Sequence, residues 1–211
     1  MSRRRAGVLW SGLVAALLTV VGSAAEPPSP GGRATFFDLE ITGRRVVFVG
    51  DRSASMSEPE GRPLAQAKRE LLASLESLGE SRQFHLLFYN DRVTVFTPPG
   101  GRGRPMFADE ETLRGVRRFV ASLSAAGGTR HADAVAAALA LAPDEIFLLT
   151  DGEARDDLAE DELQRLAGRL GRTRLMVVQF GPAAGNHSPR LARLAAMSGG
   201  KFRVVDPVGG D

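Results

Sequence analysis

The chain has 211 residues, 43% of them hydrophobic, which is enough for one compact domain and too few for two large ones. It contains no cysteine, which excludes structural disulfides, lipid attachment through cysteine and thiolate metal sites. The formal net charge is +2, but three of the 27 basic side chains and none of the 25 acidic ones lie in residues 1–25. The remaining chain is close to neutral, so its charge gives no support for nucleic-acid binding.

The first 25 residues are typical of a secretory signal peptide. Arginines at residues 3–5 precede an apolar run over residues 8–21, and the small residues Ser23 and Ala25 suit a cleavage site before Glu26. An uncleaved membrane anchor is the alternative, although the run is shorter than the ~20 apolar residues that span a bilayer. The pattern predicts an exported protein, periplasmic or extracellular, which contacts the membrane only if this segment stays attached.

The rest of the chain is organised as a spacer, one domain and a short tail. Proline and glycine dominate residues 26–33, and we assign residues 26–43 to a spacer with a lead-in strand, residues 44–206 to the domain and residues 207–211 to the tail. Runs of β-branched and aromatic residues predict strands at Arg45–Gly50, Phe84–Tyr89, Val93–Thr97, Glu145–Thr150, Arg174–Gly181 and Lys201–Val205. Helical periodicity predicts helices at Pro63–Leu78, Glu110–Leu123, Arg130–Leu141, Leu158–Leu170 and Pro189–Met197.

Strands that are almost entirely apolar, separated by amphipathic helices, predict a parallel sheet covered on both faces. The runs at Phe84–Tyr89 and Val93–Thr97 are joined by three polar residues, which favours a hairpin and therefore an antiparallel edge strand. The expected fold class is α/β: a doubly wound, Rossmann-like, mostly parallel six-stranded sheet with helices on both faces and one antiparallel edge strand.

Three polar segments are expected at one edge of this sheet, where ligands of doubly wound folds bind. Asp51, Ser53 and Ser55 follow the first strand, and Asp151 follows the strand at residues 145–150. Thr129 opens the helix that leads into that strand, and such a helix begins where the parallel strands end. Two carboxylates and three hydroxyls are hard oxygen ligands, which favour Mg²⁺ or Mn²⁺ over zinc or copper.

The same segments resemble a known motif. VVFVGDRSASM, AGGTRHADAV and IFLLTDGEA are similar to the three parts of the metal ion-dependent adhesion site of von Willebrand factor type A (VWA) domains. The resemblance extends over roughly residues 44–205. It implies that Asp51, Ser53 and Ser55 form the DxSxS motif, that Thr129 is the separate threonine, and that Asp151 is the aspartate of the TDG segment.

The resemblance also implies a mode of action. In this family the hydroxyls bind the ion directly, one or both aspartates act through water, and a carboxylate of another protein completes the coordination. Two residues depart from the usual pattern, since Gly50 stands where an aliphatic residue is common and Ala54 where glycine is frequent. Neither departure removes a ligand.

The expected function is a divalent-cation-dependent protein-binding module for adhesion or assembly, acting in the cell envelope or outside the cell, and not an enzyme. One alternative is a structural VWA subunit with a purely stabilising metal. The other is a metal-dependent hydrolase or phosphatase, but Ser53 stands where haloacid dehalogenase phosphatases have their second acid. We expect His131 to border the site without binding the ion, His85 to be half-buried in a strand and His187 to be solvated.

Overall fold

The computed structural model describes residues 33–207 apart from residues 59, 99–100, 102–103, 153, 183–184 and 186. The predicted signal peptide, residues 26–32 of the spacer segment and residues 208–211 of the tail therefore lie outside the described residues. Where the chain is described, no helix is both long and apolar enough to cross a membrane.

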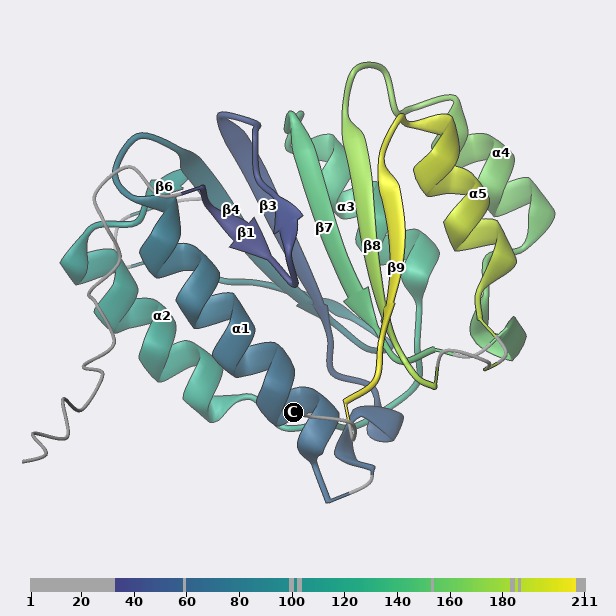
Figure 1. The fold of residues 1–211 in the computed structure, drawn as a ribbon, viewed down its shortest axis with the longest axis horizontal. Coiled ribbons are helices and arrows are strands. Elements are labelled where there is room, and N and C mark those ends of the chain that lie inside the picture. Colours follow the sequence, from purple (N-terminus) through teal and green to yellow (C-terminus); the bar gives the residue numbers. More distant parts are fainter. Residues whose placement is uncertain are drawn as a thin grey trace, which may run out of the picture. The chain divides into compact units, whose positions relative to one another are not determined.

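A mostly parallel sheet forms the centre of the molecule (Figure 1). Its strands lie in the order β5-β4-β3-β7-β8-β9, and β3, β4, β7, β8 and β9 run parallel to one another. The two short strands β5 and β6 both pair with β4, antiparallel to it. The bounds are Arg45–Asp51 for β3, Gln83–Tyr89 for β4, Val93–Val95 for β5, Met106–Phe107 for β6, Glu145–Thr150 for β7, Arg174–Phe180 for β8 and Lys201–Val205 for β9.

Helices cover both faces of this sheet because successive apolar side chains of a strand point to opposite sides. In β3, Val46 and Phe48 join one buried cluster while Val47 and Val49 join the other. Figure 1 shows α1 and α2 on one side and α4 and α5 on the other, and α3 packs with the latter two. The helices are α1 at Arg62–Leu78, α2 at Glu110–Ser122, α3 at His131–Ala140, α4 at Glu160–Ala167 and α5 at Pro189–Met197.

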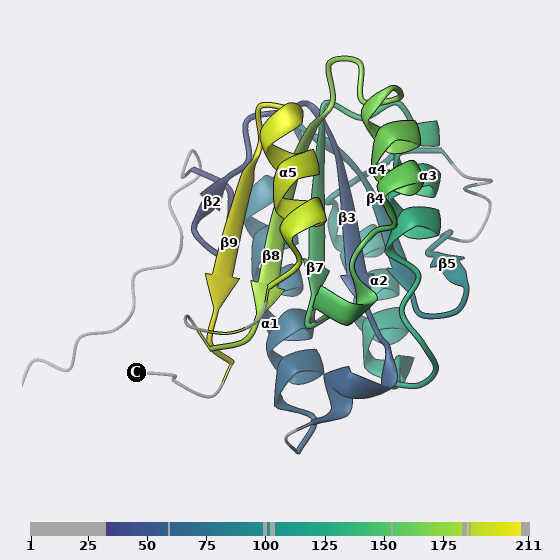
Figure 2. The same ribbon diagram turned by 90° about the vertical axis from the view of Figure 1, so that its right-hand side faces the viewer.

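A separate hairpin of β1 (Thr35–Phe36) and β2 (Leu39–Glu40) completes the α1 face of the sheet. The ring of Phe36 packs edge-on against the rings of two sheet phenylalanines. The turn residues of this hairpin, Phe37 and Asp38, have left-handed φ angles of 48° and 56°. Figure 2 shows β2 beside β9, and Nη2 of Arg203 donates to Oδ2 of Asp38 over 2.7 Å. Part of the predicted lead-in segment is thus packed into the core.

The predicted α/β fold class is confirmed, including the parallel strands, the helices on both faces and the antiparallel edge pairing. The predicted number of six strands is wrong, because β6 adds a seventh strand to the described sheet. The predicted helix over residues 158–170 is also shorter at both ends. It begins at Glu160, where the carboxylate of Glu162 accepts a hydrogen bond from the backbone N–H of Ala159 over 2.9 Å.

The topology opens a space at one end of the sheet, beyond the carboxyl ends of β3 and β7. The helix that follows β3 is α1, on one face, whereas the helix that follows the neighbouring strand β7 is α4, on the opposite face. The connections leaving these two strands therefore diverge, which opens space beyond their carboxyl ends. The short 3-10 helices η1 (Ala54–Ser57) and η2 (Ala154–Asp156) lie in these two connections.

Candidate metal centre

The first segment of the site is the turn that follows β3. Asp51 is the last residue of the strand and is fully buried. Its Oδ1 atom accepts a hydrogen bond from the backbone N–H of Ser53 over 2.7 Å, which folds the chain back on the carboxylate. Met56, fully buried in the core below, anchors the following 3-10 turn. The loop that carries Ser53 and Ser55 is thus held at both ends.

Hydroxyl groups connect this turn to the end of β7. The Oγ atoms of Ser53 and Ser55 lie 3.1 Å apart, and the Ser55 hydroxyl donates to Oδ1 of Asp151 over 2.9 Å. Residues separated by nearly one hundred positions are therefore in direct contact. Four of the five residues predicted for the site, namely Asp51, Ser53, Ser55 and Asp151, belong to one hydrogen-bonded series.

The third segment, which carries Thr129, is attached to the first by backbone hydrogen bonds. The N–H of Ala54 donates to the carbonyl of Gly127 over 3.0 Å, and the N–H of Ala126 donates to the carbonyl of Arg52 over 2.9 Å. Gly127 has a φ of 81°, and a Cβ there would lie 2.4 Å from Oδ2 of Asp91. Glycine is therefore required where the loop turns into α3. Half-buried Thr129 follows two residues later, next to Arg130, which is the N-cap residue of that helix.

Asp51 is a buried carboxylate that accepts several hydrogen bonds. Besides the Ser53 N–H, its Oδ2 atom accepts from the hydroxyl of Thr150 over 2.7 Å and from the hydroxyl of Tyr89 over 3.2 Å. The pKa of Asp51 is raised to about 6, mainly by burial and to a smaller extent by the nearby charge of Asp151, while the hydrogen bonds from Ser53 and Thr150 act in the opposite direction. The carboxylate is ionised at neutral pH, but its negative charge is costly there, which favours a compensating cation.

The donor set decides which ions would fit. Among the described residues, no three histidine, aspartate or glutamate side chains converge on one point, so a site built from carboxylates or imidazoles alone is absent from that part of the chain. The series offers the carboxylates of Asp51 and Asp151 and the hydroxyls of Ser53 and Ser55, and Thr129 lies in the adjacent segment. This chemistry suits a small hard cation such as Mg²⁺ or Mn²⁺ and does not suit zinc or copper.

Residues 44–204 match the family model of the von Willebrand factor type A domain. The chain belongs to this family. The chain is 32% identical to human inter-alpha-trypsin inhibitor heavy chain H4 over an alignment of 123 residues, and 29% identical to the Bos taurus protein of that name over 128 residues. These matches cover 52% and 54% of this chain but only 12% and 13% of the relatives.

Two solved structures show the same fold. A von Willebrand factor type A protein from Catenulispora acidiphila superposes with a TM-score of 0.67 and 24% identity, covering 78% of this chain and 39% of that one. The conserved hypothetical protein BatB from Bacteroides thetaiotaomicron gives a TM-score of 0.58 and 17% identity, covering 78% of this chain and 91% of that one. At such identities the likeness establishes the fold alone.

Sequence reasoning missed two side chains that contact Asp51 in this VWA domain. Thr150 and Tyr89 are the last residues of β7 and β4, the strands on either side of β3. The signal was present, because each of these residues closes a predicted strand at the edge where the site was expected. However, hydroxyl side chains at the ends of neighbouring parallel strands can be assigned to a shared partner only when the strand register is known. In this register Tyr89 lies opposite Asp51.

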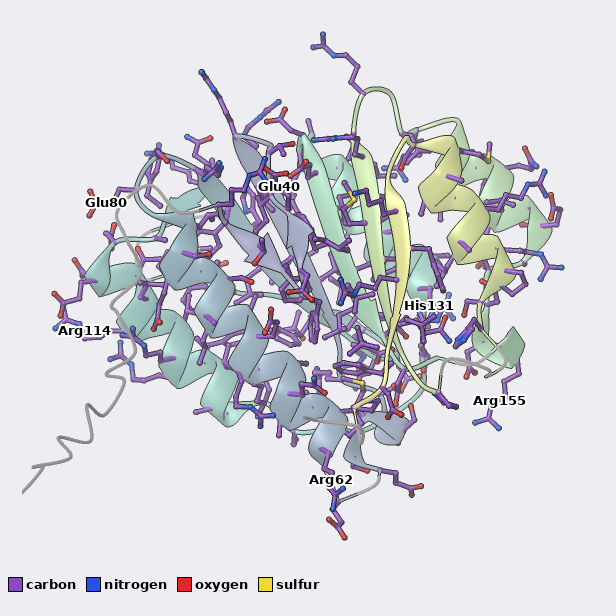
Figure 3. The ribbon with its side chains drawn as sticks, in the orientation of Figure 1. Glu40, Arg62, Glu80, Arg114, His131 and Arg155 are labelled. Carbon is purple, nitrogen blue, oxygen red and sulfur yellow. The ribbon has the colours of Figure 1, made fainter. Side chains whose placement is uncertain are left out.

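His131 and His85 are both buried. His131 borders the site, as predicted, but it is only 2% exposed, and its Nδ1 atom lies 2.8 Å from the hydroxyl of Tyr89. Burial lowers its pKa to about 4, so the ring is neutral at physiological pH. His85, predicted to be half-buried, is 7% exposed. In Figure 3 His131 lies within the fold, whereas Arg155 of η2 projects away from it.

A polar cavity of about 270 Å³ lies next to the site, between the start of α3 and the η2 connection. Its charged lining residues are partnered within the fold. Arg130 pairs with Asp133 over 2.5 Å, and both carboxylate oxygens of Asp157 accept backbone N–H groups of α5. Thr129 and His131 are among the lining residues of this cavity.

Proposed function

We propose that this VWA domain is a divalent-cation-dependent protein-binding module. VWA domains commonly serve as protein-interaction modules, and the finer assignment of a metal-dependent site rests on one observation. This is the hydrogen-bonded series of Asp51, Ser53, Ser55 and Asp151, which gathers oxygen atoms from the ends of two adjacent strands. Mg²⁺ or Mn²⁺ would be held by these four residues together with Thr129.

Charge explains why such an ion would control binding. Asp151 and Asp51 carry negative charge at the edge where a partner would approach, so a partner's carboxylate brought there without a cation would be repelled. A bound divalent ion would balance both aspartates and leave a coordination position for that carboxylate. The proposed partner is therefore a protein that presents an acidic side chain, and no nucleic acid is proposed.

Two other functions remain as alternatives. In the first, the ion only ties three loops together and binds no partner group, as in a closed structural metal site. The second is a metal-dependent hydrolase or phosphatase. Against it, the imidazole of His131 is buried and engaged with Tyr89, so it is unsuited to act as a base on a bound substrate. We propose a binding protein and no enzymatic activity.

We also propose that the domain acts in the cell envelope or outside the cell. This part of the proposal rests on the signal-like pattern of residues 1–25. The intact mass of native protein tests it, because cleavage would leave a chain that begins near Glu26. A membrane-bound form that retains residues 1–25 would contradict cleavage and support an anchored module.

The metal site is tested by titrating Mg²⁺ and Mn²⁺ into the folded protein in a calorimeter. Ser55→Ala and Thr129→Val should abolish or strongly weaken the binding heat, since each removes a hydroxyl of the site. Ser57→Ala is the matched control, because its hydroxyl lies in the same 3-10 turn but donates to the carbonyl of Ala54. Absence of binding heat in folded wild-type protein, or equal loss in the control, would contradict the site.

The open coordination position is tested with Mn²⁺-loaded protein and short peptides. A glutamate-containing peptide should displace water from the ion and lower the water-proton relaxation enhancement, whereas the same peptide with glutamine should leave it unchanged. If neither peptide changes the relaxation while Mn²⁺ stays bound, the ion is purely structural and the recognition function is wrong.

A further inference from the structure

A second hydrogen-bonded series lies on the core side of the proposed metal site. Asp51 is the one proposed ligand of the ion that belongs to it. Tyr89 is fully buried, and its hydroxyl lies between Oδ2 of Asp51 at 3.2 Å and Nδ1 of His131 at 2.8 Å. The three residues come from β3, β4 and the first turn of α3. They connect the buried side of the carboxylate to a helix start.

The proton arrangement in this series follows from the number of donors. A tyrosine hydroxyl has one proton, and an ionised Asp51 can only accept, so the Tyr89 proton points to Asp51. His131 must then donate from Nδ1 to the Tyr89 oxygen. This leaves Nε2 of His131 without a proton, facing Gly152, and Nε2 is buried and has no hydrogen-bond partner among the described residues.

The register of the sheet fixes the geometry of this series. Asp51 and Tyr89 are directly paired across the parallel strands β3 and β4, and both side chains point to the α3 face. The aromatic ring of Tyr89 is packed in the core, so its hydroxyl cannot move without disturbing the sheet. The Tyr89 hydroxyl therefore holds Oδ2 of Asp51 from the core side, and the backbone N–H of Ser53 holds Oδ1 from the loop side.

We propose that Tyr89 and His131 are positioning residues of the metal centre. They orient the Asp51 carboxylate through the series His131–Tyr89–Asp51, so that cation affinity depends on two side chains that do not touch the ion. The inference rests on the proposed metal site and adds to it. Hydrogen-bond partners of metal-binding residues typically change affinity by about 10- to 100-fold when they are removed.

The test is the Mg²⁺ and Mn²⁺ affinity of a set of variants, measured by calorimetry on the folded protein. Tyr89→Phe removes only the hydroxyl and should weaken binding about tenfold or more. His131→Gln should weaken it similarly, because glutamine places its amide near the position of Nε2. His131→Asn should restore most of the affinity, because asparagine places an N–H donor near the position of Nδ1.

A matched control separates positioning from general loss of stability. Thr173→Val removes another buried hydroxyl, one that donates to the carbonyl of Pro143 over 2.7 Å at the opposite end of the sheet. This variant should lower the melting temperature and leave cation affinity unchanged. The double variant Tyr89→Phe with His131→Gln should bind no more weakly than either single variant, because both interrupt the same series.

A spectroscopic readout uses the fact that Tyr89 is the only tyrosine of the chain. Adding Mg²⁺ should produce a near-ultraviolet difference signal of tyrosine in wild type, and this signal should vanish in Tyr89→Phe. Wild-type metal binding with unchanged affinity in Tyr89→Phe and His131→Gln would overturn the inference while leaving the metal site intact. Failure of wild type to bind either ion would overturn the metal site and, with it, this inference.

Discussion

A Cβ atom on Gly152 would lie 2.7 Å from Nε2 of His131, so the glycine that follows Asp151 is in close contact with the imidazole that supports Tyr89. Gly152→Ala should push the ring of His131 away from Tyr89. We expect a loss of about 1–3 kcal/mol in the free energy of unfolding, as for other overpacked sites, together with weaker Mg²⁺ binding. Urea unfolding and calorimetry check the two effects.

The control for this substitution is Gly168→Ala. Gly168 has a helical φ of −64°, and its nearest neighbour for an added Cβ lies at an ordinary 3.6 Å. It should therefore tolerate alanine with unchanged cation affinity. Equal effects of the two substitutions would show that contact with His131 is not the cause.

Gly50 is required by the ring of Phe88. A Cβ at this position of β3 would lie 2.5 Å from Cε1 of Phe88 on the neighbouring strand, which explains why glycine replaces the aliphatic residue common there. We expect Gly50→Val to destabilise the protein by about 1–3 kcal/mol or more. Combining it with Phe88→Ala should recover part of this loss, because the cavity receives the new side chain. Additive losses in urea unfolding would contradict the explanation.

Glu145 holds the start of β7 in place at the end of the sheet opposite the proposed metal site. Its carboxylate is fully buried and accepts hydrogen bonds from the backbone N–H groups of Thr42 and Gly43 at 3.0 and 2.9 Å, and it also pairs with Arg174. Glu145→Ala leaves the two backbone N–H groups unpaired and should cost about 1–3 kcal/mol for each of them. Cation affinity at a temperature where the variant is folded should stay at the wild-type value. A change in affinity would show that the two ends of the sheet are coupled.

Two buried groups give opposite pH dependence to the stability of the cation-free protein. Burial raises the pKa of Asp51 from 3.8 to about 6, so its contribution is fully present below pH 3.8 and is lost as pH rises through 6. Burial lowers the pKa of His131 from 6.5 to about 4, so its contribution is present above pH 6.5 and is lost as pH falls through 4. Between pH 4 and 6 the two effects oppose each other.

Asp51→Asn removes the first of these effects and keeps the second. The stability of this variant relative to wild type should therefore increase as the pH is raised from about 4 to 7 in the presence of chelator. Urea unfolding at several pH values in that range is the measurement. Parallel stability curves for the two proteins would mean that Asp51 titrates alike in the folded and unfolded states.

The main strands and helices were predictable because they follow from local patterns. Apolar runs and helical periodicity show which side chains need burial, and both patterns can be read directly from neighbouring residues in the sequence. The two-residue strand β6 was not predictable, since Met106–Phe107 is too short to show alternation. The turn of the first hairpin contains Phe37 and Asp38 with left-handed φ angles and no glycine, so it also lacks a local signal. Packing of Phe36 against the sheet fixes it instead.

By itself, the sequence determined the α/β fold class. It also determined that the five residues of the proposed site lie at the expected end of the sheet, because parallel strands end together and each residue follows a strand or opens a helix. These residues are Asp51, Ser53, Ser55, Thr129 and Asp151. Only the tertiary structure decided which atoms meet. The pairing of Asp51 with Tyr89, and of Tyr89 with His131, depends on strand register and on the position of α3. Both are set by packing between residues far apart in the chain, for which no local pattern carries a signal.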